Sequence, residues 1–133
     1  MLHQASIDVS FGDCDPAGIV FYPNYFRWMD AVFHGFLKAR AGGHAQLCQT
    51  LGAKGIGLME TSMSFASPAT DGDRLTWSLD DITWQDRSFA LTYRVETAGR
   101  KVLEGQERRG LFVMTDGRMR AAGVKALRGV LTP

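Results

Sequence analysis

A helix-like segment rich in aromatic residues is followed by four strand-like segments, and this order constrains the fold more than any other feature. Residues 24–41 carry apolar side chains at spacings of three and four, the periodicity of one buried helix face. That stripe consists of Tyr25, Met29, Val32, Phe33, Phe36 and Leu37. A helix with so many aromatic side chains must be largely buried, and we expect it to pack against a sheet.

The remaining segments have the alternation and turn signals of an antiparallel sheet. We predict strands at residues 5–11, 57–69, 73–85, 87–98 and 101–115, with turn signals at residues 70–73, 85–87, 98–101 and 115–117. Turns this short join antiparallel neighbours. The expected fold class is therefore α+β, as a single domain over residues 1–133, with the helix on the concave face of a curved five-stranded sheet. A dimer that continues the sheet would cover its edge.

The charge balance and the apolar runs exclude several classes of protein. The formal net charge is +1, so no strong field indicates a nucleic-acid or membrane-surface partner. No uncharged apolar run approaches the ~20 residues that span a bilayer, and the N-terminus lacks the pattern of a signal peptide. Cys14 and Cys48 have neither metal-ligand spacing nor the density of a disulfide framework. We therefore expect a cytoplasmic protein without a bound metal.

The stretch FGDCDPAGIVFYPNY, residues 11–25, joins the first strand to the helix and has two compatible interpretations. As structure, Asp15 before Pro16 is a helix N-cap followed by a first-turn proline. As chemistry, a carboxylate lies beside free backbone N–H groups, which stabilise developing negative charge on a carbonyl oxygen. The carboxylate can attack the carbonyl or deprotonate a water molecule. This arrangement suits a thioester, because a thiolate leaves far more readily than an alkoxide or an amine.

Other nucleophiles and bases in the sequence are less well placed. Cys14 lies between Asp13 and Asp15, and the two acids disfavour its reactive thiolate form. The three histidines fall on the polar face of the helix, in the N-terminus and in a loop, without metal-ligand spacing. Asp15 is therefore the candidate catalytic group.

The segment GDCDPAGIVFYPNYFRWMD, residues 12–30, resembles the signature of the 4-hydroxybenzoyl-CoA thioesterase family of hotdog-fold acyl-CoA thioesterases. Residues 62–76 and 84–89 match the family more loosely. The resemblance implies the hotdog fold, in which a long central helix is wrapped by a curved five-stranded antiparallel sheet. It also implies hydrolysis of a bulky or aryl acyl-CoA, such as 4-hydroxybenzoyl-CoA, to the free acid and CoA. CoA is part of this substrate, and no separate cofactor is expected.

The resemblance also implies roles for individual residues. Asp15 matches the family's catalytic carboxylate, which acts as nucleophile or general base. The backbone N–H of Tyr22 matches the group that polarises the thioester carbonyl. The substrate-binding residues that it implies are Gly18, Ile19, Tyr25, Trp28, Arg87 and Ser88. Because family members assemble with active sites at subunit interfaces, a homodimer or homotetramer is expected.

One departure from the family concerns the coenzyme. Relatives carry a basic cluster before a Ser-Phe pair, where it serves the CoA phosphates, whereas this chain has Gln85 and Asp86 there and keeps only Arg87. Either other cations hold CoA or the carrier is an acyl carrier protein. The other candidate cations are Arg108, Arg109, Arg118 and Arg120.

Two further functions remain alternatives at the level of sequence. A hotdog dehydratase or hydratase would need a histidine paired with an acid near the helix start, and no histidine is placed there. A non-catalytic acyl-CoA-binding module would have no need for an acid that faces the thioester.

Overall fold

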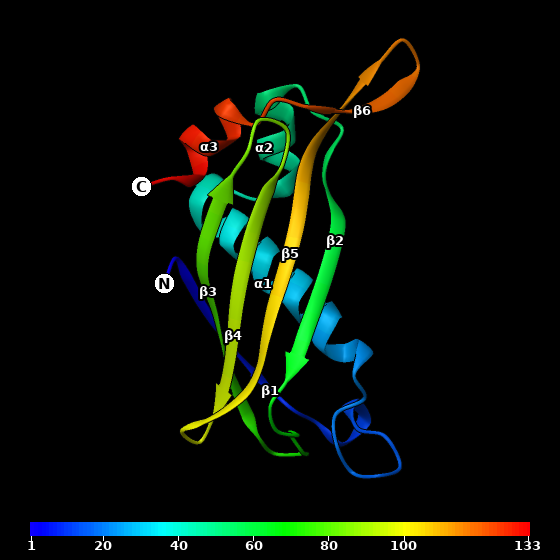
Figure 1. Cartoon of the computed structure of the whole chain (residues 1–133), viewed down its shortest axis with the longest axis vertical. Coiled ribbons are helices and arrows are strands. Elements are labelled where there is room, and N and C mark those ends of the chain that lie inside the picture. The colour runs from blue at the N-terminus through cyan, green and yellow to red at the C-terminus, as the bar shows by residue number, and fades with distance from the viewer. The chain divides into compact units, whose positions relative to one another are not determined.

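The computed structural model describes residues 1–133, and Figure 1 follows the helices and strands along the chain. The strands are β1 (His3–Asp8), β2 (Gly55–Phe65), β3 (Arg74–Trp84), β4 (Phe89–Thr97), β5 (Arg100–Thr115) and β6 (Arg118–Ala122). The α-helices are α1 (Pro23–Ala41), α2 (His44–Leu51) and α3 (Lys125–Leu131), and a short 3-10 helix, η1, covers Phe11–Asp13. The predicted long helix and all five predicted strands are therefore present.

The six strands form one sheet in the order β1-β3-β4-β5-β2, with β6 paired to β5. β1 runs antiparallel to β3, with Ile7 opposite Leu75, and β6 runs antiparallel to β5, with Arg120 opposite Val113. The predicted α+β class with an antiparallel sheet is confirmed. The sixth strand and helix α3 lie in residues 118–133, where no element was predicted.

Contacts divide the chain into two compact units, which are described separately. The first unit comprises Met1–Phe33, Ser62–Asp81 and Thr92–Gln106, and the second comprises His34–Thr61, Ile82–Leu91 and Glu107–Pro133. The boundaries fall inside α1 and inside strands β2 to β5 rather than in linkers. The single-domain organisation expected from the sequence stays a prediction.

In the first unit, the N-terminal half of α1 packs closely on the sheet. Tyr25, Met29, Val32 and Phe33 are each at most 4% exposed, as the apolar stripe predicted. At Gly105 in β5, an added Cβ would lie 2.9 Å from the sulfur of Met29, so the missing side chain lets the helix approach the strand. The sheet contributes Leu75, Trp77, Leu79, Tyr93, Val95, Val102 and Leu103 to this core.

In the second unit, the C-terminal half of α1 is buried together with apolar residues of α2 and α3. This core contains Phe36, Leu37, Leu47, Cys48, Ile56, Phe89, Leu91, Leu111, Val124, Leu127 and Leu131. Burial raises the pKa of the Cys48 thiol. The unit also buries a charged pair, in which Arg109 Nη2 donates to Glu107 Oε2 at 2.7 Å. Removing one partner would leave an uncompensated buried charge.

Two hairpins of the sheet use turns of the same unusual geometry. The β4–β5 turn places Ala98 at φ 48° and Gly99 at φ 77°, and the β5–β6 turn places Asp116 at φ 51° and Gly117 at φ 75°. Positive φ at both central positions is the type I′ geometry that matches the twist of a hairpin. Aspartate and glycine tolerate this region, whereas alanine is strained there.

Two surface features complete the fold. The first strand ends at Asp8, so the expectation that strand pairing extends to Phe11 is wrong, and Phe11 is 82% exposed in η1. Edge strand β2 exposes Leu58, Met59 and Phe65 by 51%, 40% and 53%. No helix in the structure is both long enough and apolar enough to cross a membrane.

Candidate functional site

Between η1 and α1 the chain folds back on itself in a short hydrogen-bonded ladder. Its pairs are Asp13 with Phe21, Cys14 with Val20, and Asp15 with Ile19. Gly18 closes the turn at φ 82°, a conformation that favours glycine. Val20 is 3% exposed, and its N–H donates to Ala69 O at 2.9 Å. The ladder is thus anchored to the rest of the first unit.

Asp15 caps a turn rather than a helix, because α1 begins only at Pro23. Its Oδ1 accepts the N–H of Ala17 at 2.9 Å, which forms an Asx turn over Pro16. The second oxygen, Oδ2, accepts no hydrogen bond from the chain. The half-buried carboxylate is therefore oriented through one oxygen and open to a ligand through the other.

Asp13 has a different role from Asp15. Its Oδ2 accepts hydrogen bonds from the backbone N–H and the hydroxyl of Ser10, both at 2.9 Å. Its carbonyl oxygen accepts Asn24 Nδ2 at 2.8 Å, and Arg27 Nη2 lies 3.9 Å from its Oδ1. These contacts fasten η1 to the start of α1, so Asp13 stabilises the junction that carries Asp15.

The start of α1 leaves one backbone donor unused. Asn24 and Tyr25 donate their N–H groups to the carbonyls of Phe21 and Tyr22 at 3.0 Å each. Pro23 has no N–H, and the N–H of Tyr22 makes no hydrogen bond within the chain. The amide of Tyr22 is therefore available to a carbonyl oxygen of a ligand.

A pocket of about 290 Å³ lies beside Tyr22. It is lined by Ile19, Val20, Tyr22, Tyr25, Phe65, Ala66, Ser67 and Pro68. Ile19 and Tyr25 thus lie in its wall, whereas Trp28 contacts the Tyr25 ring edge-on at 5.7 Å and Gly18 lies in the turn. Residues 65–68 were not singled out from the sequence, although they fall within the loosely family-like segment 62–76. The mostly apolar lining suits an apolar acyl group.

The other two predicted binding residues, Arg87 and Ser88, belong to the second unit. Arg87 Nη1 donates to Ala121 O at 3.0 Å. The Ser88 hydroxyl donates to Gln85 Oε1 at 3.4 Å and accepts Arg108 Nη1 at 3.1 Å. Arg87 and Arg108 are therefore both held beside the turn between β3 and β4.

The remaining cations differ in their availability to a phosphate. Arg109 is buried against Glu107, so the suggestion that it holds CoA is wrong. Arg118 and Arg120 are exposed on β6. Lys125 and Arg128 line a pocket of about 350 Å³ together with Trp84, Gln85, Asp86 and Val124. Those two cations were missed because residues 118–133 have no clear period.

Of the three histidines, only His3 belongs to the first unit, which contains the ladder. His34 and His44 lie in the second unit with ring centroids 5.4 Å apart, and His44 Nε2 accepts the N–H of Ile56 at 3.0 Å. No group of three or more His, Cys, Asp or Glu side chains is arranged to hold a metal ion.

Comparison with known proteins assigns the chain to a family. The model of the thioesterase superfamily matches residues 17–104, more than half of the chain. The chain belongs to the thioesterase superfamily. Within this superfamily, a 4-hydroxybenzoyl-CoA thioesterase from Pseudomonas sp. (strain CBS-3) is 37% identical over 125 residues, covering 89% of this chain and 88% of the relative.

Solved thioesterase structures agree with this assignment. The structure of the Pseudomonas enzyme matches with a TM-score of 0.85 and 32% identity over 96% of both chains. A gentisyl-coenzyme A thioesterase matches with a TM-score of 0.76 and 29% identity, covering 92% of this chain and 96% of the other. The predicted hotdog fold is confirmed, and the chain is an acyl-CoA thioester hydrolase.

Proposed function

We propose that this thioesterase hydrolyses an aryl-CoA, such as 4-hydroxybenzoyl-CoA, to the free aryl acid and CoA. The observation that carries the proposal is the ladder of residues 13–21, which presents a carboxylate with a free oxygen and precedes the unused amide of Tyr22. The largely apolar pocket beside that amide suits an aromatic ring. The similar Pseudomonas protein, named for 4-hydroxybenzoyl-CoA, and the gentisyl-coenzyme A thioesterase support an aryl group.

In the proposed reaction, the Tyr22 amide acts on the carbonyl oxygen of the thioester and Asp15 acts at the carbonyl carbon. The Tyr22 N–H hydrogen-bonds to the carbonyl oxygen and stabilises the oxyanion that forms when the carbon is attacked. Either the carboxylate of Asp15 or a water molecule that Asp15 deprotonates adds to the carbon and gives a tetrahedral intermediate; on the first route, loss of CoA leaves an anhydride with Asp15, which water then hydrolyses. On both routes the C–S bond breaks, and CoA leaves as a thiolate that is protonated from solvent. No cofactor other than the CoA of the substrate is required.

Asp15→Asn tests this function. The amide of asparagine keeps an oxygen for the Ala17 N–H, so the turn and the thermal stability should be preserved. It can neither attack nor accept a proton efficiently, so kcat for aryl-CoA should fall by about a thousandfold or more. Thiol release measured with a disulfide reagent reports the rate, and Asp8→Asn, which alters only an exposed ion pair, is the control. Near-normal turnover together with a lower melting temperature would favour a purely structural role.

Cations of the second unit are proposed to bind the phosphates of CoA. Arg87 is exposed, and Lys125 and Arg128 line one pocket without an ion-pair partner. Ser88 is proposed to take part through its hydroxyl, which already contacts Arg108. These cations offset the loss of positive charge at Gln85 and Asp86.

We also propose a homodimer or homotetramer in a reducing, cytoplasmic setting. Edge strand β2 exposes unpaired backbone groups together with Leu58, Met59 and Phe65, and a second copy would cover them. Both cysteines, Cys14 and Cys48, are free thiols, which supports a reducing compartment.

A further inference from the structure

We infer that Arg100 is a positioning residue for hydrolysis: its guanidinium holds residues 66–70, of which 66–68 line the pocket beside Tyr22, in the shape that accepts the acyl group. The inference rests on the proposed function, because it takes this pocket to be the acyl site. Arg100 itself lies outside the pocket lining, so it would act through the wall and not by touching the substrate.

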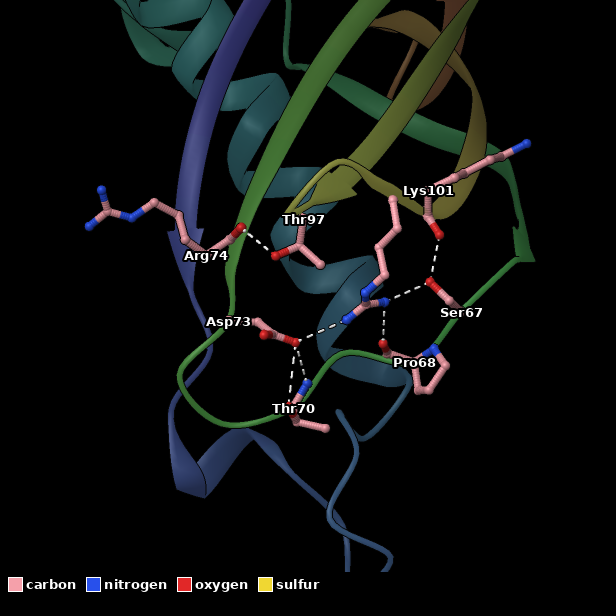
Figure 2. Close-up of polar contacts among 8 residues, drawn as sticks. Ser67, Pro68, Thr70, Asp73, Arg74, Thr97 and Lys101 are labelled. Atoms are coloured by element: carbon pink, nitrogen blue, oxygen red, sulfur yellow. Dashed lines mark hydrogen bonds and ion pairs between the residues drawn. The ribbon is translucent and has the colours of Figure 1, made fainter.

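The guanidinium of Arg100 bridges both ends of the segment between β2 and β3. Its Nη1 donates to Ser67 Oγ and to Pro68 O, both at 2.7 Å, and its Nη2 donates to Asp73 Oδ2 at 3.3 Å (Figure 2). Three acceptors from one segment thus meet one planar group. A lysine has a single nitrogen on a flexible stem and would not hold the same three acceptors in a fixed fork.

The acceptors of Arg100 are themselves fixed by further hydrogen bonds. The Ser67 hydroxyl donates to Lys101 O at 2.5 Å, and Asp73 Oδ2 also accepts the Thr70 N–H at 2.9 Å (Figure 2). A change at Arg100 removes the cross-link between Ser67 and Asp73, while Ser67 keeps its hydrogen bonds to β5 and Asp73 keeps those to Thr70. We therefore expect the segment to loosen rather than to unfold.

The same segment is fastened to the catalytic ladder. Ala69 is fully buried, and its carbonyl accepts the N–H of Val20 at 2.9 Å. Burial raises the pKa of Tyr25, which lines the pocket, and the backbone of Ala69 acts in the opposite direction. A shift of residues 66–70 would therefore reach the pocket wall directly and the ladder through Ala69.

Because the Arg100 side chain is partly exposed, we expect it to contribute little to the overall stability of the protein. The Arg100 side chain is 43% exposed, so its ion pair with Asp73 is partly screened by water. Arg74, the next residue after Asp73, provides a matched control because its side chain pairs only with exposed Asp8, at 2.8 Å. Neutralising either arginine removes one charge from the same unit.

The test compares Arg100→Gln, Arg100→Lys and Arg74→Gln on 4-hydroxybenzoyl-CoA, hexanoyl-CoA and acetyl-CoA. For Arg100→Gln we expect KM for the aryl substrate to rise about tenfold, with kcat changed less than threefold and the preference for aryl over acetyl reduced. Arg100→Lys should recover part of the preference. Arg74→Gln should match the wild type, and all variants should melt within a few degrees of one another.

Hydrogen exchange supplies a readout that does not depend on catalysis. In Arg100→Gln the amides of residues 66–70 and of Val20 should exchange faster, while those of β3 and β4 keep their rates. The inference is overturned if Arg100→Gln matches Arg74→Gln in acyl preference and exchange, or if it lowers kcat equally for all substrates while the melting temperature falls. If the wild type hydrolyses no aryl-CoA, the proposed substrate is refuted instead. The exchange experiment would still show whether Arg100 fixes residues 66–70.

Discussion

Asp13 and Asp15 are separated by one residue and differ in how many partners their carboxylates have. Asp13 binds two donors of Ser10 and lies near Arg27, whereas Asp15 uses one oxygen for a single backbone amide. A carboxylate that is already occupied by hydrogen bonds and a nearby cation of the same chain is poorly placed to act on a substrate. The one that the fold holds by a single oxygen keeps its other oxygen for chemistry.

A residue-scale prediction concerns the cations that we assign to CoA. The double variant Lys125→Gln with Arg128→Gln should raise KM for an aryl-CoA roughly tenfold, about 1.4 kcal/mol of binding, with kcat little changed. The KM for the matching pantetheine thioester, which lacks the nucleotide phosphates, should not change. Steady-state thiol release on both substrates makes the comparison, with Lys38→Gln, a change at an exposed position of α1, as the control. An equal rise in KM for both substrates would contradict the assignment.

At the residue scale, the sequence could predict the part of the site that is contiguous in the chain. Asp15, Ile19 and Tyr22 lie between the first strand and α1, and Tyr25 lies in the first turn of α1. The wall at residues 65–68 is brought in by tertiary structure. Its support, Arg100, follows a hairpin turn and has no local pattern that separates it from an ordinary surface cation. Periodicity cannot detect such contacts, because they depend on where distant segments meet.

At the scale of elements, two type I′ turns of the sheet differ in their first residue. Asp116-Gly117 uses the residue types that this turn favours, whereas Ala98-Gly99 places alanine at φ 48°. The cost of a left-handed alanine is about 1–2 kcal/mol. The β4–β5 hairpin therefore forms in spite of its turn residue and is stabilised by its flanking strands.

Ala98→Asn should relieve this strain. Asparagine tolerates the left-handed region, so the free energy of unfolding should increase by about 1 kcal/mol, which is roughly 3–6 °C in melting temperature. Calorimetry or thermal circular dichroism measures the shift. The reverse change in the other turn, Asp116→Ala, should lower the melting temperature. A loss of stability in Ala98→Asn would show that the turn is not strained.

The long elements were predictable and the short terminal ones were not. α1 and β1 to β5 have sustained periodicity and clear turns, whereas β6 is a short strand with only exposed or half-buried residues. Its place is set by pairing with β5, where Arg120 lies opposite Val113. A pattern of inward and outward residues cannot exist in a strand that buries neither face, so the sequence carried no signal for it.

At the scale of the whole molecule, the least protected part of the sheet is the edge at β2. Most of this strand is exposed, and Leu58 and Met59 are large apolar residues on it. Exposed apolar side chains beside unpaired backbone groups favour association with another strand. This combination is the physical basis for the proposed dimer or tetramer.

Leu58→Glu tests the proposed assembly. In a symmetric interface, the glutamates of the two β2 strands would lie close together and repel each other. The variant should therefore be monomeric where the wild type is an oligomer. Light scattering coupled to size-exclusion chromatography gives the mass. The control is Val130→Glu, which places the same charge at an exposed position of α3. A monomeric wild type, or a Leu58→Glu variant of unchanged mass, would contradict the proposal.

The strand order also bears on how the chain reaches its native state. β3, β4 and β5 are neighbours in sequence and in the sheet, so short loops are enough to pair them. β1 can pair only after β3 has been synthesised, and β2 only after β5, because these partners come much later in the chain. Closing those long loops costs more chain entropy and slows folding. The strand exposed at the finished edge is thus also one that stays unpaired while the chain emerges from the ribosome, when a chaperone or a neighbouring chain could bind it.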